Sequence, residues 1–383
     1  MKLAWAEVCI NPRQPVRQAG FWQQVHPVLE VKDDLHAYVL AFRDDHQTLI
    51  QIAVDSLGLP LGVQEQVERA AEGVLGTKTH LIISCTHTHF APDGTDAAYQ
   101  KQLVRCLNEA VASLRFEECS QLAYTLEQEH YDGLGRSRIS SHPAEHITLS
   151  LIGIWKDGRR WASLVCYNCH PTVLNGDTPY FSAEYPGEAL RILHKRHPQE
   201  HFLFLQGAAG DISTRFTRLG QDYPSMQAMA ARFAKEAEQL HSRSSRLQDI
   251  SAISCRQKRI DLLHDIGRPE PPMPARLSER EKETIAIGRK VHIELALHPQ
   301  DLARHELLSV FCLGCLKLVY APNELFSWYA GCCPAAVLVC YSSGYLPYVT
   351  EPDFQGLTYE WYTDTLSAAS KTLLVETLQQ LGQ

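Results

Sequence analysis

The stretch HLIISCTHTHFAPDG, residues 80–94, begins as an apolar strand and ends in a polar turn. Side chains two residues apart on a β-strand lie on the same face, so His87 and His89 are predicted to project together from the end of this strand. Two neighbouring imidazoles would supply about half of the ligands of a metal site. A chain with 18 histidines contains such a pair about once by chance, so the pair alone is weak evidence.

Strand-like and helix-like patterns alternate on both sides of this stretch. Residues 35–43 and 47–59 have the pattern of a β-hairpin, and residues 63–75 carry apolar side chains at helical spacing. A second hairpin is predicted at 146–155 and 161–169. Further helices are predicted at 96–114, 186–197, 225–242, 278–298 and 359–381, and further strands at 201–206, 307–321 and 335–343. The sequence therefore predicts an α/β fold in which a mixed β-sheet core is flanked by helices.

The strongest interruption of this pattern lies at residues 263–279, where proline and glycine exclude regular structure. We interpret residues 263–299, approximately, as an insertion or lid-like excursion that caps the site and selects the substrate. The whole chain, 1–383, is interpreted as one catalytic domain that contains this insertion.

Composition limits the possible partners and the compartment. The chain has 383 residues, of which 45% are hydrophobic and 21% charged, with a net charge of -8 and no long basic run. This balance argues against nucleic acid as a partner. No apolar run reaches the roughly 18 residues of a transmembrane helix, and the first residues lack a secretory signal, so we expect a cytoplasmic protein without an integral membrane segment. Many of the 12 cysteines lie in apolar runs, so no disulfides are expected.

Polar or glycine-containing segments follow five strongly apolar strands. Loops at the strand ends of an α/β sheet meet at one edge, so the active site is predicted to lie in these strand-end loops. The segments are THTH from residue 86, HPT from 170, GAAGDIS from 207, PNE from 322 and YSSGYLPY from 341.

In order along the chain, these segments resemble the catalytic domain of the neutral (non-lysosomal) ceramidase family. Its members are zinc-dependent hydrolases that cleave the amide bond of N-acyl sphingosines. The resemblance spans roughly residues 5–360 and rests on segments similar to the family motifs THTHSGPGG (86–94), HPTS (170–173), SADxPG (182–187), GDVSP (210–214), PGE (322–324) and YITTYEEYQAQRYE (348–360). It departs from the family at Arg138 and Thr214, where the family has proline, and at Asn323, where it has glycine.

The resemblance implies a zinc ion bound by His87, His170, Glu324 and Tyr348. Two imidazoles, a carboxylate and a phenol are suitable zinc ligands, and bound zinc activates water for attack on a carbonyl. Tyr345 is an alternative to Tyr348, because the segment between them allows the alignment to slide.

The same resemblance implies that His89, Arg136, Ser213 and Tyr359 surround the reacting amide. His89 would pass a proton to the leaving amine, and Arg136 and Tyr359 would bind the developing oxyanion or a substrate hydroxyl. Ser213 is either the nucleophile or a group that orients water. Asp211 is either a partner that fixes a histidine tautomer or the cap of its own loop.

The implied function is a ceramidase-like zinc amidohydrolase acting on a small N-acyl or lipid-like molecule. The chain ends soon after the last motif, without the β-sandwich domain of the full-length family, so a soluble or less lipidic N-acyl substrate is an equal alternative to ceramide. The alternatives are a zinc-dependent esterase or other carbonyl-transforming metalloenzyme on the same fold, and a non-catalytic binding protein.

Overall fold

The computed structural model describes residues 1–21, 24–139, 142–243 and 246–383. Its first sheet has five strands in the order β4-β3-β2-β1-β5, in which β3 and β4 are parallel and the other pairs antiparallel. Helices α1 and α2 pack on this sheet. The elements are β1 (Lys2–Cys9), β2 (His36–Arg43), β3 (Gln47–Val54), α1 (Leu61–Leu75), β4 (Lys78–Cys85), α2 (Ala97–Ala112) and β5 (Glu117–Glu118). The first predicted hairpin is therefore confirmed as β2 and β3.

The second sheet also has five strands, in the order β10-β9-β8-β6-β12, and α3 and α4 pack on it. Its elements are β6 (Leu122–His130), β8 (Thr148–Lys156), β9 (Arg159–Tyr167), α3 (Glu184–Arg196), β10 (His201–Gln206), α4 (Tyr223–His241) and β12 (Gln248–Asp249). The second predicted hairpin is β8 and β9. Asp157 and Gly158 both have positive φ, at 50° and 80°, which is the conformation that a tight hairpin turn requires.

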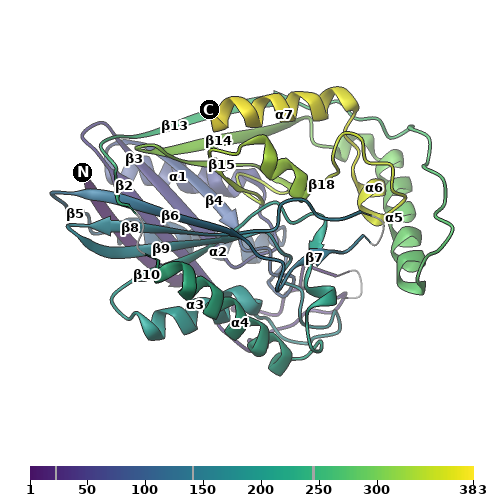
Figure 1. Ribbon diagram of the computed structural model, residues 1–383, viewed down its shortest axis with the longest axis horizontal. Coiled ribbons are helices and arrows are strands. Elements are labelled where there is room, and N and C mark those ends of the chain that lie inside the picture. Colours follow the sequence, from purple (N-terminus) through teal and green to yellow (C-terminus); the bar gives the residue numbers. More distant parts are fainter. Residues whose placement is uncertain (22–23, 140–141, 244–245) are drawn as a thin grey trace.

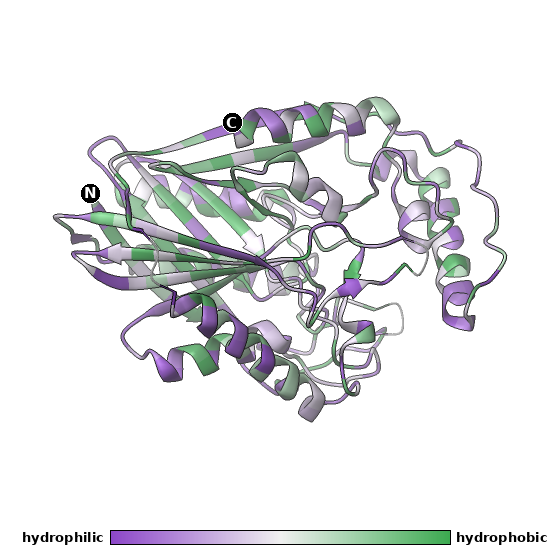
Figure 2. Cartoon of the chain, viewed as in Figure 1, coloured by the Kyte–Doolittle hydropathy of each residue, from purple (hydrophilic) through white to green (hydrophobic). Residues whose placement is uncertain are grey.

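The two sheets share a hydrophobic core because side chains alternate along their strands. Leu40 and Phe42 of β2 pack in one cluster with Leu151 of β8, whereas Val39 and Ala41 belong to the cluster beneath α1 and α2. Figure 2 shows hydrophobic residues along the central strands and mixed surfaces on the outer helices. The architecture is thus helix, sheet, sheet, helix, which confirms the predicted α/β class.

A third sheet, in the order β13-β14-β15-β17, is packed by α7. Two short sheets, β11-β7 and β16-β18, connect the strand ends near the candidate site. The remaining elements are β7 (Arg136–Ser137), β11 (Ile212–Ser213), η1 (Thr214–Phe216), β13 (Ile253–Asp261), α5 (Glu279–Leu297), η2 (Pro299–Asp301), β14 (His305–Leu313), β15 (Leu316–Tyr320), β16 (Asn323–Leu325), η3 (Ser327–Cys332), β17 (Val337–Val339), β18 (Leu346–Val349), α6 (Tyr359–Thr363) and α7 (Ala368–Gly382).

The helix predicted at 359–381 is wrong as a single helix, because the chain forms α6 and α7 with a break at Asp364. Each helix has its own N-cap: Thr358 accepts a hydrogen bond from Trp361, and Ser367 accepts one from Ser370. Asp364 also binds Thr350 and the buried Lys371 through its carboxylate. The break therefore places a buried ion pair between the two helices.

The segment predicted as an excursion is irregular up to Ser278, and α5 follows it. Ser278 and Glu281 form a capping box at the start of α5. Figure 1 shows α5 and α6 together at the end of the molecule opposite the N-terminus, close to β7 and β18. The structure has all 12 cysteines as free thiols. Within the described residues, no helix has the length and apolar character needed to cross a membrane.

Candidate metal centre and active-site cavity

The strand-end segments that the sequence singled out meet in the structure. His87 and His89 follow β4, and His170 follows β9. An isolated bridge joins His170 to Ser213, and β16, which contains Glu324, pairs in parallel with β18, which contains Tyr348. Backbone pairing thus brings side chains from five distant segments to one place.

The two histidines of the HxH pair reach this place differently from the prediction. Strand β4 ends at Cys85, and His87 has a left-handed φ of 65°, so the pair does not lie on an extended strand. The ring of His87 stacks on Tyr341 at a centroid distance of 4.0 Å and meets the ring of His89 edge-on at 5.0 Å. A non-glycine residue with positive φ is strained, and such strain concentrates at functional sites.

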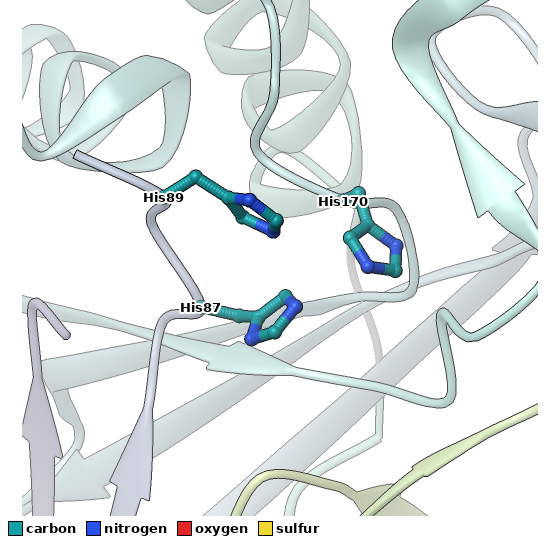
Figure 3. Close-up of side chains that lie close together, drawn as sticks. All are labelled: His87, His89 and His170. Atoms are coloured by element: carbon teal, nitrogen blue, oxygen red, sulfur yellow. The ribbon is translucent and has the colours of Figure 1, made fainter. Parts of the chain in front are cut away.

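Three backbone carbonyls fix the orientation of the imidazoles. The Nδ1 atoms of His87, His89 and His170 lie 2.8 Å from the carbonyl oxygens of Leu57, Gly20 and Ala209, respectively. A carbonyl only accepts hydrogen bonds, so each Nδ1 carries the proton and each Nε2 presents a lone pair. Figure 3 shows the three rings turned toward one another. One ring nitrogen of each histidine lies within 4.8 Å of those of the other two.

Glu324 faces two of these lone pairs. Its Oε2 lies 3.4 Å from Nε2 of His87 and 3.2 Å from Nε2 of His170, and all three side chains are buried. Burial lowers the pKa of His170 to about 4, so this imidazole is neutral at physiological pH. Burial acts to raise the pKa of Glu324, and positively charged His87 and His170 would lower it well below its usual value. With both rings neutral and both protons on Nδ1, a bound cation must take their place for the carboxylate to stay ionised.

An ionised carboxylate that faces two nitrogen lone pairs is unfavourable without a cation between them. Nitrogen and carboxylate donors at these separations are a suitable ligand set for a divalent metal ion. The Nε2 atoms of His87 and His89 are buried and have no hydrogen-bond partner among the described residues, which leaves them available for a ligand. The residues present therefore fit a bound metal.

Tyr345 and Tyr348 both reach this group, from different sides. The Tyr345 hydroxyl donates to Glu324 Oε1 at 2.6 Å, so it holds the carboxylate oxygen that points away from His170. The Tyr348 hydroxyl lies 3.4 Å from His170 Nε2. Burial raises the pKa of Tyr348 well above its usual value, and the Arg138 guanidinium, 5.0 Å from the ring centre, acts in the opposite direction.

Arg138 is the arginine beside the cluster of His87, His170 and Glu324, which is called the metal group below. It forms a salt bridge of 2.8 Å with Glu360 and lines the cavity described below. Burial opposes its charge, but Tyr348 and Glu360 raise its pKa above the ordinary value, so it stays charged. Arg136, which the resemblance implied at the reacting amide, has an exposed side chain, and its backbone pairs with Ser213. The GRSR segment carries arginine at alternate positions, and only the fold shows which one faces the site.

A cavity of about 470 Å³ opens in front of the metal group. Five of the singled-out side chains line it: His89, His170, Ser213, Tyr348 and Tyr359. The walls also include apolar side chains, among them Phe21, Ile139, Leu174, Leu277, Ile285 and Leu357. The cavity thus joins polar groups at the candidate metal centre to an apolar surface.

Ser213 and Tyr359 both line this cavity. The Ser213 Oγ accepts a hydrogen bond of 3.1 Å from the backbone N–H of Arg215, so its own proton is available to a substrate atom. Tyr359 packs edge-on against Tyr348 at 5.8 Å. Asp211 does not hold a histidine here: its carboxylate accepts hydrogen bonds from Ser327 at 2.6 and 2.8 Å.

A second histidine group, between α3 and α4, differs from this arrangement. His241 Nε2 lies 2.8 Å from Glu200, and His197 Nε2 lies 3.0 Å from Glu238. The described part of the chain shows no carbonyl bound to either Nδ1 atom, so the proton can lie on Nε2 and form an ordinary hydrogen bond. The carboxylates of this second group therefore need not face a nitrogen lone pair, as the Glu324 carboxylate does.

No protein-family model matches the chain, and no curated protein matches it by sequence. Its structure, however, is similar to solved ceramidases. A ceramidase complexed with C2 matches with a TM-score of 0.76 at 12% sequence identity, over 100% of this chain and 74% of that chain. The neutral ceramidase from Pseudomonas aeruginosa matches with a TM-score of 0.72 at 14% identity, with the same coverage. At such low identity the likeness concerns the fold: this chain has the ceramidase fold.

Proposed function

We propose that this protein is a zinc-dependent hydrolase that cleaves the amide bond of an N-acyl substrate and releases a carboxylate and an amine. One observation carries the proposal: Glu324 Oε2 lies 3.2 to 3.4 Å from two imidazole nitrogens whose protons are held on the opposite side of each ring. A shared metal ion resolves that conflict, and the cavity in front of it has room for a substrate.

In this proposal His87, His170, Glu324 and Tyr348 hold the metal. Tyr348 is preferred to Tyr345 because the Tyr345 hydroxyl already donates to Glu324. Bound zinc supplies a Lewis acid that polarises the scissile carbonyl and makes water acidic enough to attack at neutral pH. Imidazole, carboxylate and phenol oxygen are ligands that zinc accepts, and the absence of a thiolate argues against a purely structural site of the common kind.

His89 is the proton carrier in this proposal. Its Nδ1–H is held by the Gly20 carbonyl, so Nε2 is the atom that accepts a proton from the attacking water. The same atom then donates that proton to the nitrogen of the leaving amine. His89 lines the cavity, whereas His87 lies behind it and is fully buried, which is why the roles differ.

The remaining polar side chains bind the substrate. We assign to Arg138 the part that the resemblance gave to Arg136, because Arg138 is the one whose charge faces the cavity. Arg138 and Tyr359 would hydrogen-bond the carbonyl oxygen as negative charge develops on it. Ser213 would donate its hydroxyl proton to the substrate or to the attacking water, because its Oγ already accepts from Arg215.

The setting of the reaction is also part of the proposal. The ceramidase fold and the apolar cavity walls support a lipid-like acyl group on the substrate. We infer a cytoplasmic location, because all 12 thiols are free in the structure. Residues 263–299 supply cavity-lining side chains such as Leu277 and Ile285, which supports their role as an insertion that selects the substrate within a single catalytic domain.

The test is a hydrolysis assay with zinc-loaded protein on matched N-acyl amines and esters, in which released amine, alcohol and acid are quantified separately. Amide cleavage should be abolished by a chelator and restored by zinc. His170→Ala should lower kcat/KM by more than about a hundredfold, since removing even an outer-sphere partner of a metal ligand costs 10- to 100-fold. His46→Ala, at an exposed position between β2 and β3, is the matched control. Ester cleavage alone would support the esterase alternative, and neither cleavage nor bound metal would support a binding protein.

A further inference from the structure

Four arginines line the candidate cavity in addition to Arg138: Arg215, Arg218, Arg276 and Arg280. We propose that the substrate is an N-acyl amine that also carries an anionic group, a carboxylate or a phosphate, and that these arginines bind it. This inference rests on the proposed amidase function for its reaction, but anion binding can be measured without turnover. A neutral amide such as ceramide would offer these charges no anionic group.

The first two arginines come from the loop that follows Ser213. Arg215 lies in η1, and its guanidinium packs 5.3 Å from the ring of Phe216. Arg218 donates from Nη1 to the carbonyl oxygen of Thr172, two residues after His170, at 2.5 Å. Both side chains are half-buried, so they form a fixed part of the wall next to the metal group.

The other two arginines come from the excursion. Arg276 precedes α5, and Arg280 lies in its first turn. The N-terminal end of a helix carries a partial positive charge, so a cation in the first turn is unfavourable there and adds to the positive potential. Two segments about sixty residues apart in the chain thus place positively charged side chains on the walls of one cavity.

These charges repel one another in the structure. Burial lowers the pKa of Arg218, and Arg280 and Arg215 lower it further. Burial and Arg280 likewise lower the pKa of Arg215. Glu184 acts in the opposite direction on the pKa of Arg218, and Glu281 does so on the pKa of Arg215. Arg138, in contrast, is paired with Glu360.

Acidic side chains on the same cavity do not cancel this arrangement. They are Asp177, Glu281, Glu283 and Glu360. Glu360 binds Arg138, and Glu281 attracts Arg215 but accepts hydrogen bonds from Ser278 in the capping box. Asp177 and Glu283 are exposed to solvent, as are Arg276 and Arg280, whereas Arg215 and Arg218 are half-buried. An anion between the loop after Ser213 and the start of α5 would relieve the repulsion, and guanidinium groups bind carboxylate and phosphate with paired hydrogen bonds.

The test compares two ligands with the same acyl chain, N-dodecanoylglycine, which is anionic, and N-dodecanoylethanolamine, which is neutral. Their affinities for the zinc-loaded full chain are measured by calorimetry under conditions without turnover. We expect the anionic ligand to bind at least about tenfold more tightly, as charge-assisted hydrogen bonds imply. Arg218→Gln/Arg280→Gln should bring that ratio close to one, and Arg69→Gln, on the exposed face of α1, should preserve it.

Because Arg218 also holds the Thr172 carbonyl, Arg280→Gln alone is included as a variant that removes only an exposed side chain. Arg280→Gln alone should lower the ratio of anionic to neutral affinity by at least about threefold. This is part of the tenfold loss expected when Arg218 and Arg280 are both replaced. The monoamide of a long dicarboxylic acid and N-dodecanoylethanolamine phosphate show whether the anion lies on the acyl or the amine side and which acid is preferred.

Equal affinity for the neutral and all anionic ligands, or a preference that survives both arginine variants, would overturn the inference. Hydrolysis is followed separately on the same compounds. An anion preference without hydrolysis would contradict the proposed function and leave the inference intact, whereas hydrolysis without a preference would do the reverse.

Discussion

Replacing Gly20 with alanine tests both the position and the role of His89. A Cβ atom on Gly20 would lie 2.2 Å from His89 Cβ and 2.5 Å from its Cα and carbonyl oxygen. Non-bonded carbon atoms approach to about 3.5 Å, so the two residues must separate by about 1.3 Å. The clashing atoms are Cβ and backbone, so no rotation of a side chain relieves the overlap.

The expected cost follows from this displacement. Moving a reacting group by about 1 Å costs about a hundredfold in rate, which is about 2.7 kcal/mol in the activation barrier. The shift would also break the 2.8 Å hydrogen bond that sets the tautomer of His89. We expect kcat to fall about a hundredfold and the zinc content to stay at the level of the parent, because the Leu57 carbonyl holds the His87 ring and because His170 and Glu324 lie on other segments.

The assay pairs steady-state hydrolysis with metal analysis of the same preparation. Gly73→Ala is the control, because an added Cβ there, in α1, meets no atom within 4 Å. It should leave kcat unchanged and stabilise the helix by roughly 0.5 to 1 kcal/mol. Retention of more than half of kcat in Gly20→Ala would refute the role of His89. A parallel loss of zinc would instead make His89 a ligand, as its place in the three-histidine group allows.

Three further predictions concern Ser213, the two tyrosines and a buried acid. Ser213→Ala should lower kcat/KM by about 10- to 100-fold, the range for one lost substrate hydrogen bond; a loss beyond about ten-thousandfold would identify a nucleophile. Tyr348→Phe should weaken zinc binding in a competition with a chelator more than Tyr345→Phe does, and the reverse order would exchange their roles. Burial raises the pKa of Glu306 from 4.5 to about 7, so folding favours its protonated form. Glu306 should therefore lower the free energy of unfolding by up to about 3 kcal/mol as pH rises from 4.5 through 7. Chemical denaturation should show that Glu306→Gln removes this part and leaves the parts due to Asp55 and Glu184, whose pKa values burial raises to about 6 and about 7.

The apolar patterns of the chain predicted β2, β3, β4, β8, β9 and β10, because buried strands need continuous hydrophobic side chains on both faces. They did not predict β1, β6 and β13, which are partly exposed and carry many polar side chains. They also predicted that polar residues at strand ends would meet, and His87, His170, Ser213 and Glu324 do lie together. What the pattern could not provide was backbone conformation beyond the strand. The left-handed φ of His87 turns its ring toward His170, a geometry that alternation along a strand does not describe.

Arginine placement shows a second limit. Arg136 and Arg138 are equivalent by spacing, and the short pairing between β7 and β11 decides which one faces the cavity. The side chains that fix the imidazole protons were also invisible in the sequence, because they are not side chains: the carbonyls of Leu57, Gly20 and Ala209 perform this role. Backbone atoms carry no residue signature, so only the fold could show them.

The most direct measurement is the anomalous diffraction signal at the zinc absorption edge from crystals of the zinc-loaded protein. We predict one strong peak about 2.0 to 2.2 Å from Nε2 of His87, Nε2 of His170 and an oxygen of Glu324. No peak between these three side chains, with zinc at full occupancy elsewhere or bound nowhere, would contradict the claim that they share one metal ion.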